Sequence, residues 1–321
     1  MRVYRTIPAR ADLPLALTIG NFDGVHLGHR AMLDRLKREA AARELPAAVM
    51  TFEPHPREFF APDQAPTRLS SLREKLEMLA ALGVDRTYVC RFTYDFARTP
   101  AEEFVARVLV QGLGVRWLLV GDDFRFGARR AGDMQLLSAL SQRHGYEVHS
   151  MASVVADGRR VSSTAVREAL SDGDLELAAQ LLGRPYLISG RVVRGDRIGR
   201  TLGFPTANVR MRHNRPPLYG IFAVRVHGLG PRPVNGAASL GVRPTVDTRG
   251  VPVLEVHLLD FERDIYGRHV QVEFLHKLRD EQKYPDLESL RKQIAVDVAQ
   301  IRRFFSREDL PLQASNAANS A

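Results

Sequence analysis

Cysteine is nearly absent from this sequence of 321 residues: Cys90 is the only one, so no intramolecular disulfide can form. A chain without disulfides is typical of a reducing compartment. Cys90 stands in RTYVCRF, which has the pattern of a buried strand. Because small apolar thiols are commonly core residues, we expect a structural thiol rather than a catalytic one.

Long apolar runs are also missing, and without them the sequence predicts no membrane span. The first twenty residues contain two prolines and charged side chains where a secretory signal has an unbroken apolar core. Hydrophobic residues make up 45% and charged residues 26%, which is ordinary for a globular protein with a full core. We therefore expect a cytoplasmic protein without a membrane partner.

A dense block of Lys and Arg is missing as well, although the net charge is +9. Residues 1–183 have 24 Lys and Arg against 23 Asp and Glu, and residues 184–321 have 22 against 14. The basic second half suits a small polyanion such as a nucleotide, or it serves surface solubility. Its scattered arginines favour both interpretations over a nucleic-acid partner.

The first 183 residues alternate between strand and helix patterns. Apolar runs that read as strands lie at 15–20, 47–52, 86–92, 116–121 and 147–154. Helical patterns follow residue 27 and occupy 71–83, 100–114 and 131–145. Such alternation predicts an α/β Rossmann-like domain over residues 1–183, with a parallel sheet covered on both faces.

The pattern changes near residue 184 to short β-rich runs broken by glycine and proline. Several runs alternate apolar and polar residues, which predicts an antiparallel barrel or sandwich over residues 184–308. A helical pattern over 286–305, capped by Asp286, closes this domain. Residues 309–321 are small and polar, and we expect a disordered tail.

The stretch GNFDGVHLGHR runs from a predicted strand end through a glycine-bearing turn into a helix. Open α/β sheets bind ligands at this place. His26 and His29 are three apart and project from one face of the first helical turn. Gly24 and Gly28 allow close backbone approach, and the free N–H groups of a helix start favour phosphate. A metal pair, or two plain polar turn residues, remain alternatives.

Three later segments belong to the same prediction. TFEPHP at 51–56 ends a strand and forms a rigid wall, and Asp123 in GDDFRFG stands where a ribose or base contact is expected. RRVSSTAVREAL at 159–170 offers hydroxyl, guanidinium and backbone donors to a polyphosphate, although a simple N-cap at Ser162 or Ser163 is the alternative. No hydrolytic nucleophile is in view, so the chemistry that fits is nucleotidyl transfer.

A second candidate site begins with GDRIGRTLGFPTANV at 195–209. Its glycines are able to wrap phosphates with backbone N–H groups, but it is not a P-loop, because it has no Gly-Lys-Ser/Thr and no following helix is expected. Thr206 and Asn208 face the same side of an extended stretch and offer hard oxygen ligands for Mg²⁺. A plain β-turn of a barrel is the alternative.

The run VLEVHLLDF at 253–261 places Glu255 and His257 on one strand face. An acid in a strand is most often a solvent-facing residue. A glutamate on the inner face near a magnesium site would instead accept the proton of an attacking alcohol.

Four motifs in order, GNFDGVHLGH, TFEPHP, GDDFRFG and RRVSSTAVR, resemble the adenylyltransferase module of bacterial bifunctional riboflavin kinase/FAD synthetases. The resemblance implies that His26 and His29 are catalytic residues that hold the ATP phosphates. It also implies that Phe52, Pro54 and His55 lie toward the flavin. The residues that it places around ATP are Gly20, Asp23, Gly28, Asp123, Arg160, Ser163, Thr164 and Arg167.

The run PTAN, LEVHLLDF, DIYG and FLHKLRDEQKY resembles the riboflavin kinase module of the same family. It implies a six-stranded barrel in which Thr206 and Asn208 hold Mg²⁺–ATP and Glu255 activates the ribityl 5′-hydroxyl. Arg279 would lie at the flavin end. The glycines counted with the ATP site are Gly195, Gly199 and Gly203.

The sequence departs from this family at Ala238-Ser239-Leu240, at Arg243 and at Tyr284-Pro285. These positions bear on fine substrate geometry and not on the reaction class. The resemblance implies two reactions: riboflavin and ATP give FMN, and FMN and a second ATP give FAD and pyrophosphate. One rival function is nucleotidyl transfer to another acceptor with an inert barrel. The other is nucleic-acid binding, against which the barrel segments lack an aromatic run for base stacking.

Overall fold

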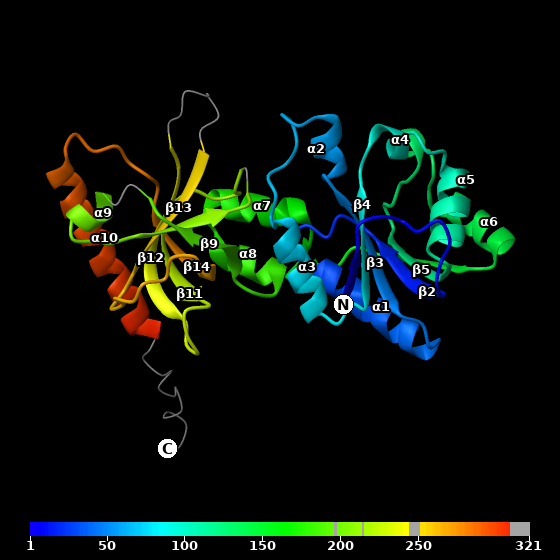
Figure 1. The fold of residues 1–321 in the computed structure, drawn as a ribbon, viewed down its shortest axis with the longest axis horizontal. Helices are drawn as coiled ribbons and strands as arrows, with labels where there is room; N and C mark the ends of the chain where they lie inside the picture. Colours follow the sequence, from blue (N-terminus) through cyan, green and yellow to red (C-terminus); the bar gives the residue numbers. More distant parts are fainter. Residues whose placement is uncertain (196–197, 214, 244–250, 309–321) are drawn as a thin grey trace, which may run out of the picture. The chain divides into compact units, whose positions relative to one another are not determined.

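The structure is a computed structural model that describes residues 1–195, 198–213, 215–243 and 251–308 (Figure 1). Its contacts divide the chain into two compact units. The first unit comprises residues 1–167 and 180–183, and the second comprises residues 168–179 and the chain from 184 onward. The domain boundary at 183/184 stays a prediction, and the expected disordered tail at 309–321 lies outside the described residues.

The first unit contains a six-stranded parallel sheet, which confirms the predicted Rossmann-like architecture. Its spatial order is β1-β4-β3-β2-β5-β6. The strands are β1 (Arg2–Tyr4), β2 (Leu15–Ile19), β3 (Ala47–Glu53), β4 (Arg86–Arg91), β5 (Val115–Gly121) and β6 (Glu147–Met151). The edge strand β1 was outside the prediction because its three residues, partly exposed and headed by an arginine, have no apolar alternation.

Helices cover both faces of this sheet. On one face α1 (Leu27–Ala42) and α3 (Leu72–Ala81) bury Leu33, Leu36 and Leu79 against alternate strand residues. On the other face η1 (Phe104–Gly112) and α6 (Met134–His144) pack on the remaining strand side chains. Smaller helices are α2 (Pro56–Phe60), α4 (Tyr94–Ala97), α5 (Ala101–Glu103) and η2 (Ala128–Arg130).

The predicted helix at 100–114 differs in one respect from what the structure has. It consists of α5 followed by η1, a nine-residue π-helix. Apolar periodicity predicts that a segment is helical, but it does not distinguish i→i−4 from i→i−5 hydrogen bonds.

A short hairpin precedes the next helices. It consists of β7 (Val155–Ala156) and β8 (Arg159–Arg160), joined by Asp157 and Gly158 with φ of 49° and 75°. Asp-Gly with both residues left-handed is the preferred two-residue hairpin turn. Arg160, expected at a helix start, therefore lies in a strand. The helices that follow are α7 (Ser163–Asp172) and α8 (Leu175–Leu182).

The second unit contains a closed six-stranded antiparallel barrel in the order β10-β13-β12-β11-β14-β9, which confirms the predicted barrel. Its strands are β9 (Tyr186–Val193), β10 (Ala207–Met211), β11 (Gly220–His227), β12 (Val234–Arg243), β13 (Val251–Leu258) and β14 (His269–Arg279). The helices are α9 (Ile198–Thr201) and α10 (Leu287–Glu308). Asp286 caps α10 as expected, because its Oδ1 accepts the Ser289 N–H at 2.7 Å.

The inside and the outside of the barrel follow from the packing of α10. Ala223 of β11 packs with Val298, Ile301 and Phe305 of this helix and therefore faces outward. Its neighbour Phe222, which is fully buried, faces inward because strand side chains alternate. The described residues contain no helix with the length and apolarity of a bilayer span.

Candidate functional sites on the two units

The first site lies at the switch point of the sheet, where successive strands are added on opposite sides of β2. β2 is hydrogen-bonded to β3 on one side and to β5 on the other, so the loops after β2 and β5 leave the same edge of the sheet. Gly20 begins the first of these loops, and Asp123 lies in the second. Crevices at such switch points are the usual ligand sites of open α/β sheets.

His26 and His29 form a stacked pair at the start of α1. His26 is the N-cap residue, and its Nδ1 accepts the His29 N–H at 3.4 Å. The ring centroids lie 3.7 Å apart with an interplanar angle of 20°. A Cβ at Gly28 would come within 3.1 Å of the His26 ring, so glycine leaves room for this stack. The helix start thus presents two imidazoles from one face, as the spacing predicts.

Burial keeps both imidazoles neutral. It lowers the pKa of His26 to about 4, and it lowers the pKa of His29 well below the ordinary value, with the neighbouring His26 as a further cause. His29 Nδ1 is buried and has no hydrogen-bond partner. At pH 7 the pair therefore offers hydrogen bonds to a phosphate rather than a full positive charge. Among the described residues, no group of three or more His, Cys, Asp or Glu is arranged to hold a metal ion.

Asp23 is only 5% exposed and is fully engaged by protein donors. Its carboxylate accepts the N–H groups of Leu69 and Ser70 at 3.0 to 3.1 Å. Oδ2 also accepts from Arg167 at 2.6 Å. The sequence predicts Asp23 among the residues around ATP. In the structure its carboxylate joins the loop after β2 to the segment before α3 and to α7.

The start of α7 is tied to the same loop. Ser162 caps the helix, because its Oγ accepts the Ala165 N–H, whereas the Ser163 hydroxyl donates to the Asp23 carbonyl at 3.0 Å. Thr164 is exposed. Arg167 donates to the Thr67 carbonyl at 2.6 Å in addition to Asp23. The structure thus brings Ser163 and Arg167 to the loop that carries the histidines.

Arg160 and Asp123 meet each other at the surface. Their ion pair measures 3.2 Å, and their side chains are 59% and 75% exposed. Two charges this exposed cost little to separate, so both are available to a ligand. The structure thereby joins two predicted residues, one from the loop after β5 and one from the hairpin strand β8.

The residues predicted on the flavin side have separate local roles. The Phe52 ring packs against Phe92 and Phe96, at centroid distances of 5.9 and 6.0 Å. His55 follows the cis Glu53–Pro54 bond and is the N-cap of α2, where its Nδ1 accepts the Arg57 N–H at 3.1 Å. Burial lowers the pKa of His55. The sequence predicts only a rigid wall here, and the helix α2 is an addition.

Sequence analysis did not identify Lys75, which lies buried in α3 with 5% exposure. Its Nζ lies 3.5 Å from Thr51 Oγ1 at the end of β3. The helical spacing did contain a signal, because Lys75 follows Leu72 by three residues and precedes Leu79 by four. A lysine on the apolar face of a helix is unusual and marks a buried charge.

Cys90 agrees with its prediction as a structural thiol. The residue is 3% exposed and belongs to the hydrophobic core on the η1 side of the sheet. Burial raises the pKa of this thiol to about 12, so the reactive thiolate is not populated near neutral pH.

The second site is a row of polar side chains across three barrel strands. Asn208 pairs with Glu255, and Glu255 pairs with Ser239. Ser239 is two residues from Ala237, which pairs with the outward-facing Ala223, so the whole row faces outward. The sequence left open whether Glu255 faces into or out of the barrel, and the structure shows that it faces outward. Period-2 alternation identifies a shared face, but only the packing of α10 shows which face is outside.

The glycine loop lies directly over this row. A Cβ at Gly195 would overlap the Asn208 side chain, and a Cβ at Gly199 would come within 3.3 Å of Thr206 Oγ1. Gly203 has a φ of 87°, which glycine adopts without strain. The four-residue helix α9 lies within the loop, and strand β10 rather than a helix follows it, as expected for a loop that is not a P-loop. Thr206 and Asn208 are thus both covered by glycine backbone.

Arg279 is held by a buried partner. It donates to Asp297 at 3.0 Å through Nε and at 2.6 Å through Nη2, and Asp297 is only 4% exposed. Its guanidinium carbon also lies 6.0 Å from the centre of the Tyr284 ring. Glu281, which the sequence analysis did not identify, accepts a hydrogen bond from Ser239 at 2.8 Å and so brings a second carboxylate to the row.

The departures from the family pattern divide by face. Ala238 and Leu240 are buried and point into the barrel, whereas Ser239 belongs to the outer row. The side chain of Arg243 lies outside the described residues. His257, on the same outer face as Glu255, lies with Nδ1 at 2.9 Å from the Pro205 carbonyl.

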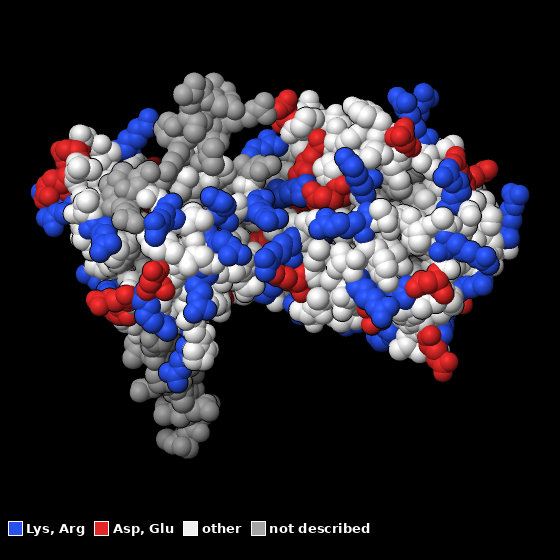
Figure 2. All heavy atoms as spheres, viewed as in Figure 1, with Lys and Arg blue, Asp and Glu red and all other residues white. Residues whose placement is uncertain are grey.

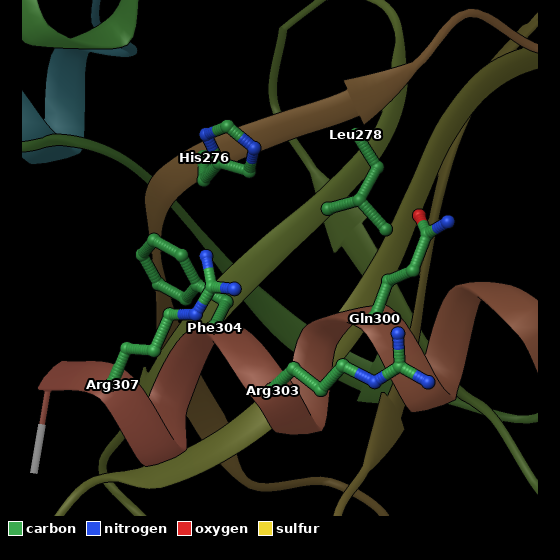
Figure 3. Close-up of a pocket in the computed structure, with 6 residues that line it drawn as sticks. All are labelled: His276, Leu278, Gln300, Arg303, Phe304 and Arg307. Carbon is green, nitrogen blue, oxygen red and sulfur yellow. The ribbon is translucent and has the colours of Figure 1, made fainter.

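A separate cavity of about 500 Å³ lies between β14 and α10 (Figure 3). His276 stacks on Phe304 there, with centroids 5.3 Å apart, and Arg303 and Arg307 line the cavity from the helix side. None of its lining residues is predicted for either site.

On the face drawn in Figure 2, Lys and Arg mix with acidic and uncharged residues rather than forming one block.

Comparison with known proteins matches both parts of the chain to known families. The FAD synthetase family model matches residues 9–165, and the riboflavin kinase family model matches residues 182–305. The bifunctional riboflavin kinase/FMN adenylyltransferase of Escherichia coli K12 is 52% identical, over 95% of this chain and 98% of that protein. The Haemophilus influenzae protein of the same name is 47% identical, over 91% and 94%.

A solved structure from Streptococcus pneumoniae, described as a macrolide-efflux protein, has a TM-score of 0.81 at 28% identity. It covers 94% of this chain and 99% of its own. The two family models cover most of each unit, and the relatives match almost end to end. The chain therefore belongs to the family of bifunctional riboflavin kinases/FMN adenylyltransferases.

Proposed function

We propose that this chain makes FAD from riboflavin in two steps, with one active site on each unit. The observation that carries this function is the match of an FAD synthetase model and a riboflavin kinase model to successive parts of one chain. Each part contains a polar constellation suited to its reaction. The substrates are riboflavin, FMN and ATP.

In the barrel, riboflavin is phosphorylated. The ribityl 5′-hydroxyl gives its proton to Glu255 while its oxygen bonds to the γ-phosphorus of ATP. The bond between that phosphorus and the β,γ-bridging oxygen breaks, and ADP leaves. The position of Glu255 supports this role. It is paired with Asn208 across β10 and β13 in the outward row, so the base lies next to a residue on the phosphate side.

Magnesium fits the donor set of this row. Thr206 and Asn208 supply hydroxyl and amide oxygens, which are hard ligands, and the glycine loop above them leaves room for phosphates. We assign Mg²⁺ to these two residues, with Gly195, Gly199 and Gly203 giving backbone contacts to ATP. The ion would neutralise charge on the phosphates.

In the first unit, FMN is adenylylated. A phosphate oxygen of FMN bonds to the α-phosphorus of ATP. The bond between that phosphorus and the α,β-bridging oxygen breaks, and pyrophosphate leaves. The neutral His26 and His29 donate hydrogen bonds to the ATP phosphates at the start of α1. Their stacking fixes both rings before substrate binds, so little is spent on orientation during the reaction.

The remaining predicted residues take supporting roles in this proposal. Ser163 and Arg167 hold the histidine loop, and Thr164 with the exposed Arg160 and Asp123 is available to the nucleotide. Gly20 and Gly28 keep the loop close to ATP, and Asp23 organises it. Phe52, Pro54 and His55, and Arg279 in the barrel, stay predictions for the flavin sides. The cytoplasmic location also stays a prediction.

The test is incubation with riboflavin, ATP and Mg²⁺, followed by chromatography of the flavins over time. FMN should appear first and FAD second, and supplied FMN should give FAD directly. Unchanged riboflavin would exclude the kinase, and unchanged FMN would point to another acceptor for the adenylyl group. Tight, salt-dependent nucleic-acid binding without turnover would favour the rival binding function.

A further inference from the structure

Lys75 is a buried cation that the proposed mechanism has not used. It is 5% exposed, and burial lowers its pKa. Among the described residues it has no carboxylate within ion-pair distance, and its one hydrogen-bond partner is Thr51 Oγ1 at 3.5 Å. An ammonium group has three protons to donate, so most of its capacity faces no protein acceptor.

The buried or half-buried guanidinium groups of the same region are already neutralised. Arg68 donates to Glu53 at 2.7 and 2.9 Å and is also paired with Glu58. Arg167 is paired with Asp23 at 2.6 Å. Their charge is therefore committed to protein carboxylates. Lys75 differs from both, because its charge is balanced only by groups beyond direct contact.

The position of Lys75 links the two halves of the predicted crevice. Thr51, which Lys75 contacts, donates to the Asn21 carbonyl at 3.2 Å in the histidine loop. Burial is the main cause of the lowered pKa values of His29, predicted on the ATP side, and His55, predicted on the flavin side, and the charge of Lys75 contributes to both. It therefore lies near both.

Orphaned polar atoms occur in the same region. Asn21 Oδ1 and His29 Nδ1 are both buried without a hydrogen-bond partner. Buried polar atoms in native proteins are nearly always hydrogen-bonded, and exceptions call for an explanation such as a ligand. Together with the underused ammonium of Lys75, they indicate a polar space that the chain itself does not fill.

Lys75 has no evident benefit for stability where it stands. Taking a charge out of water without a paired partner is unfavourable. Lys75 also lies in the first turn of α3, where the helix dipole disfavours a cation. Because both effects disfavour the folded state, the presence of a lysine at this position calls for a functional explanation.

The adenylyl transfer supplies such a reason. It brings the phosphate of FMN against the α-phosphate of ATP, and two anions at bonding distance repel each other. A cation between them lowers this repulsion as they approach. We propose that the Lys75 ammonium binds the phosphate of FMN and holds it in line with the α-phosphorus of ATP. This inference rests on the proposed adenylyltransferase function of the first unit.

The decisive variant is Lys75→Met, which keeps the length of the side chain and removes the charge. We expect kcat/KM for FMN to fall by about 100-fold, the scale of one hydrogen bond to a charged group. KM for ATP should change little, and riboflavin phosphorylation should be unaffected. Because an unpaired charge leaves the core, urea stability followed through the single, buried Trp117 should be equal or higher.

The matched control is Lys37→Met on α1, whose partner is Asp34 at 3.0 Å on the surface. It should leave FAD formation unchanged. The proposal is overturned if Lys75→Met loses stability and affects FMN and ATP equally, since that is a structural role. It is also overturned if only KM for ATP rises. Failure of the wild-type chain to form FAD would instead reject the function on which the inference rests.

A measurement on the wild-type chain covers the case in which the variant does not fold. Lysine side chains labelled with ¹³C at Cε are titrated by NMR, and Lys75 is the lysine with the lowered pKa. FMN should raise this pKa, because a bound phosphate stabilises the ammonium form, whereas riboflavin should not. An equal response to both flavins, or none to FMN, contradicts the proposal.

Discussion

The Arg167 guanidinium and the Asp23 carboxylate, 144 positions apart in the chain, meet at 2.6 Å with side chains only 15% and 7% exposed. Asp23 also accepts the Leu69 and Ser70 N–H groups. Two distant segments, residues 69–70 and α7, are thus fixed to the loop that leads to His26. The position of the proposed adenylyltransferase loop relative to these segments depends on this one carboxylate.

Asp23→Asn should strongly destabilise the first unit. The substitution keeps the shape but leaves the largely buried Arg167, 15% exposed, without its counter-charge, and breaking a buried pair typically costs about 3–5 kcal/mol. Urea unfolding followed through Trp117 fluorescence measures the loss. Asp34→Asn, which removes the exposed partner of Lys37, is the control and should cost at most about 1 kcal/mol. Equal losses in the two variants would show that the Asp23 network contributes little.

Acidification should destabilise the first unit through its histidines. The folded pKa of His26 is about 4, whereas the ordinary value is 6.5. Between these values the unfolded chain binds the proton more readily, so the stabilisation is complete above pH 6.5 and is lost as pH falls toward 4. From pH 7 to pH 5, His26 alone should account for a loss of about 2 kcal/mol.

The variant that tests this pH dependence is His26→Asn, because asparagine also caps helices but does not titrate. Its urea stability should fall by about 2 kcal/mol less between pH 7 and pH 5 than that of the wild-type chain. His29 and His55, whose pKa values are lowered by burial in the same direction, contribute to the remaining loss. An unchanged acid loss would mean that His26 is not buried in the neutral form.

The two activities should separate by mutation. Glu255→Gln should lower FMN formation by at least about 100-fold, because the hydroxyl loses its base, while FAD formation from supplied FMN continues. His29→Gln should do the reverse. Chromatography of the flavins with either substrate measures both reactions. The control is Glu273→Gln, which changes a β14 carboxylate that is hydrogen-bonded to His227. It should leave both reactions unchanged. A parallel fall of both activities in either site variant, with the fold intact, argues against independent sites.

Gly195→Ala should impair the kinase alone. The added methyl would overlap the Asn208 side chain, so either the loop or the amide must move. Overpacking of this kind costs roughly 1–3 kcal/mol, and we expect kcat/KM for ATP in FMN formation to fall about tenfold or more. Gly230→Ala is the control, since its nearest neighbour would be an arginine nitrogen at 3.7 Å. Wild-type kinetics in Gly195→Ala would show that the loop does not need its close approach to Asn208.

Much of the fold was predictable from local pattern. Alternating apolar runs and helical segments up to residue 154 predict the parallel sheet, and period-2 runs after 184 predict the barrel. These patterns succeed because a buried strand and an amphipathic helix impose their own spacing on apolar residues. The edge strand Arg2–Tyr4 and the hairpin at Arg160 escape because their few residues bury little.

The sequence by itself determined the two architectures, the order of the motifs and the shared faces of His26 with His29 and of Glu255 with His257. Spacing along a helix or strand settles such relations locally. Tertiary structure alone decided that Asp23 is held by Arg167, that Glu255 faces out of the barrel and that Thr51 is the hydrogen-bond partner of Lys75. Each depends on segments that come into contact only after folding. Contacts between distant segments determine which charges are paired and which side chains are buried, so local spacing does not predict them.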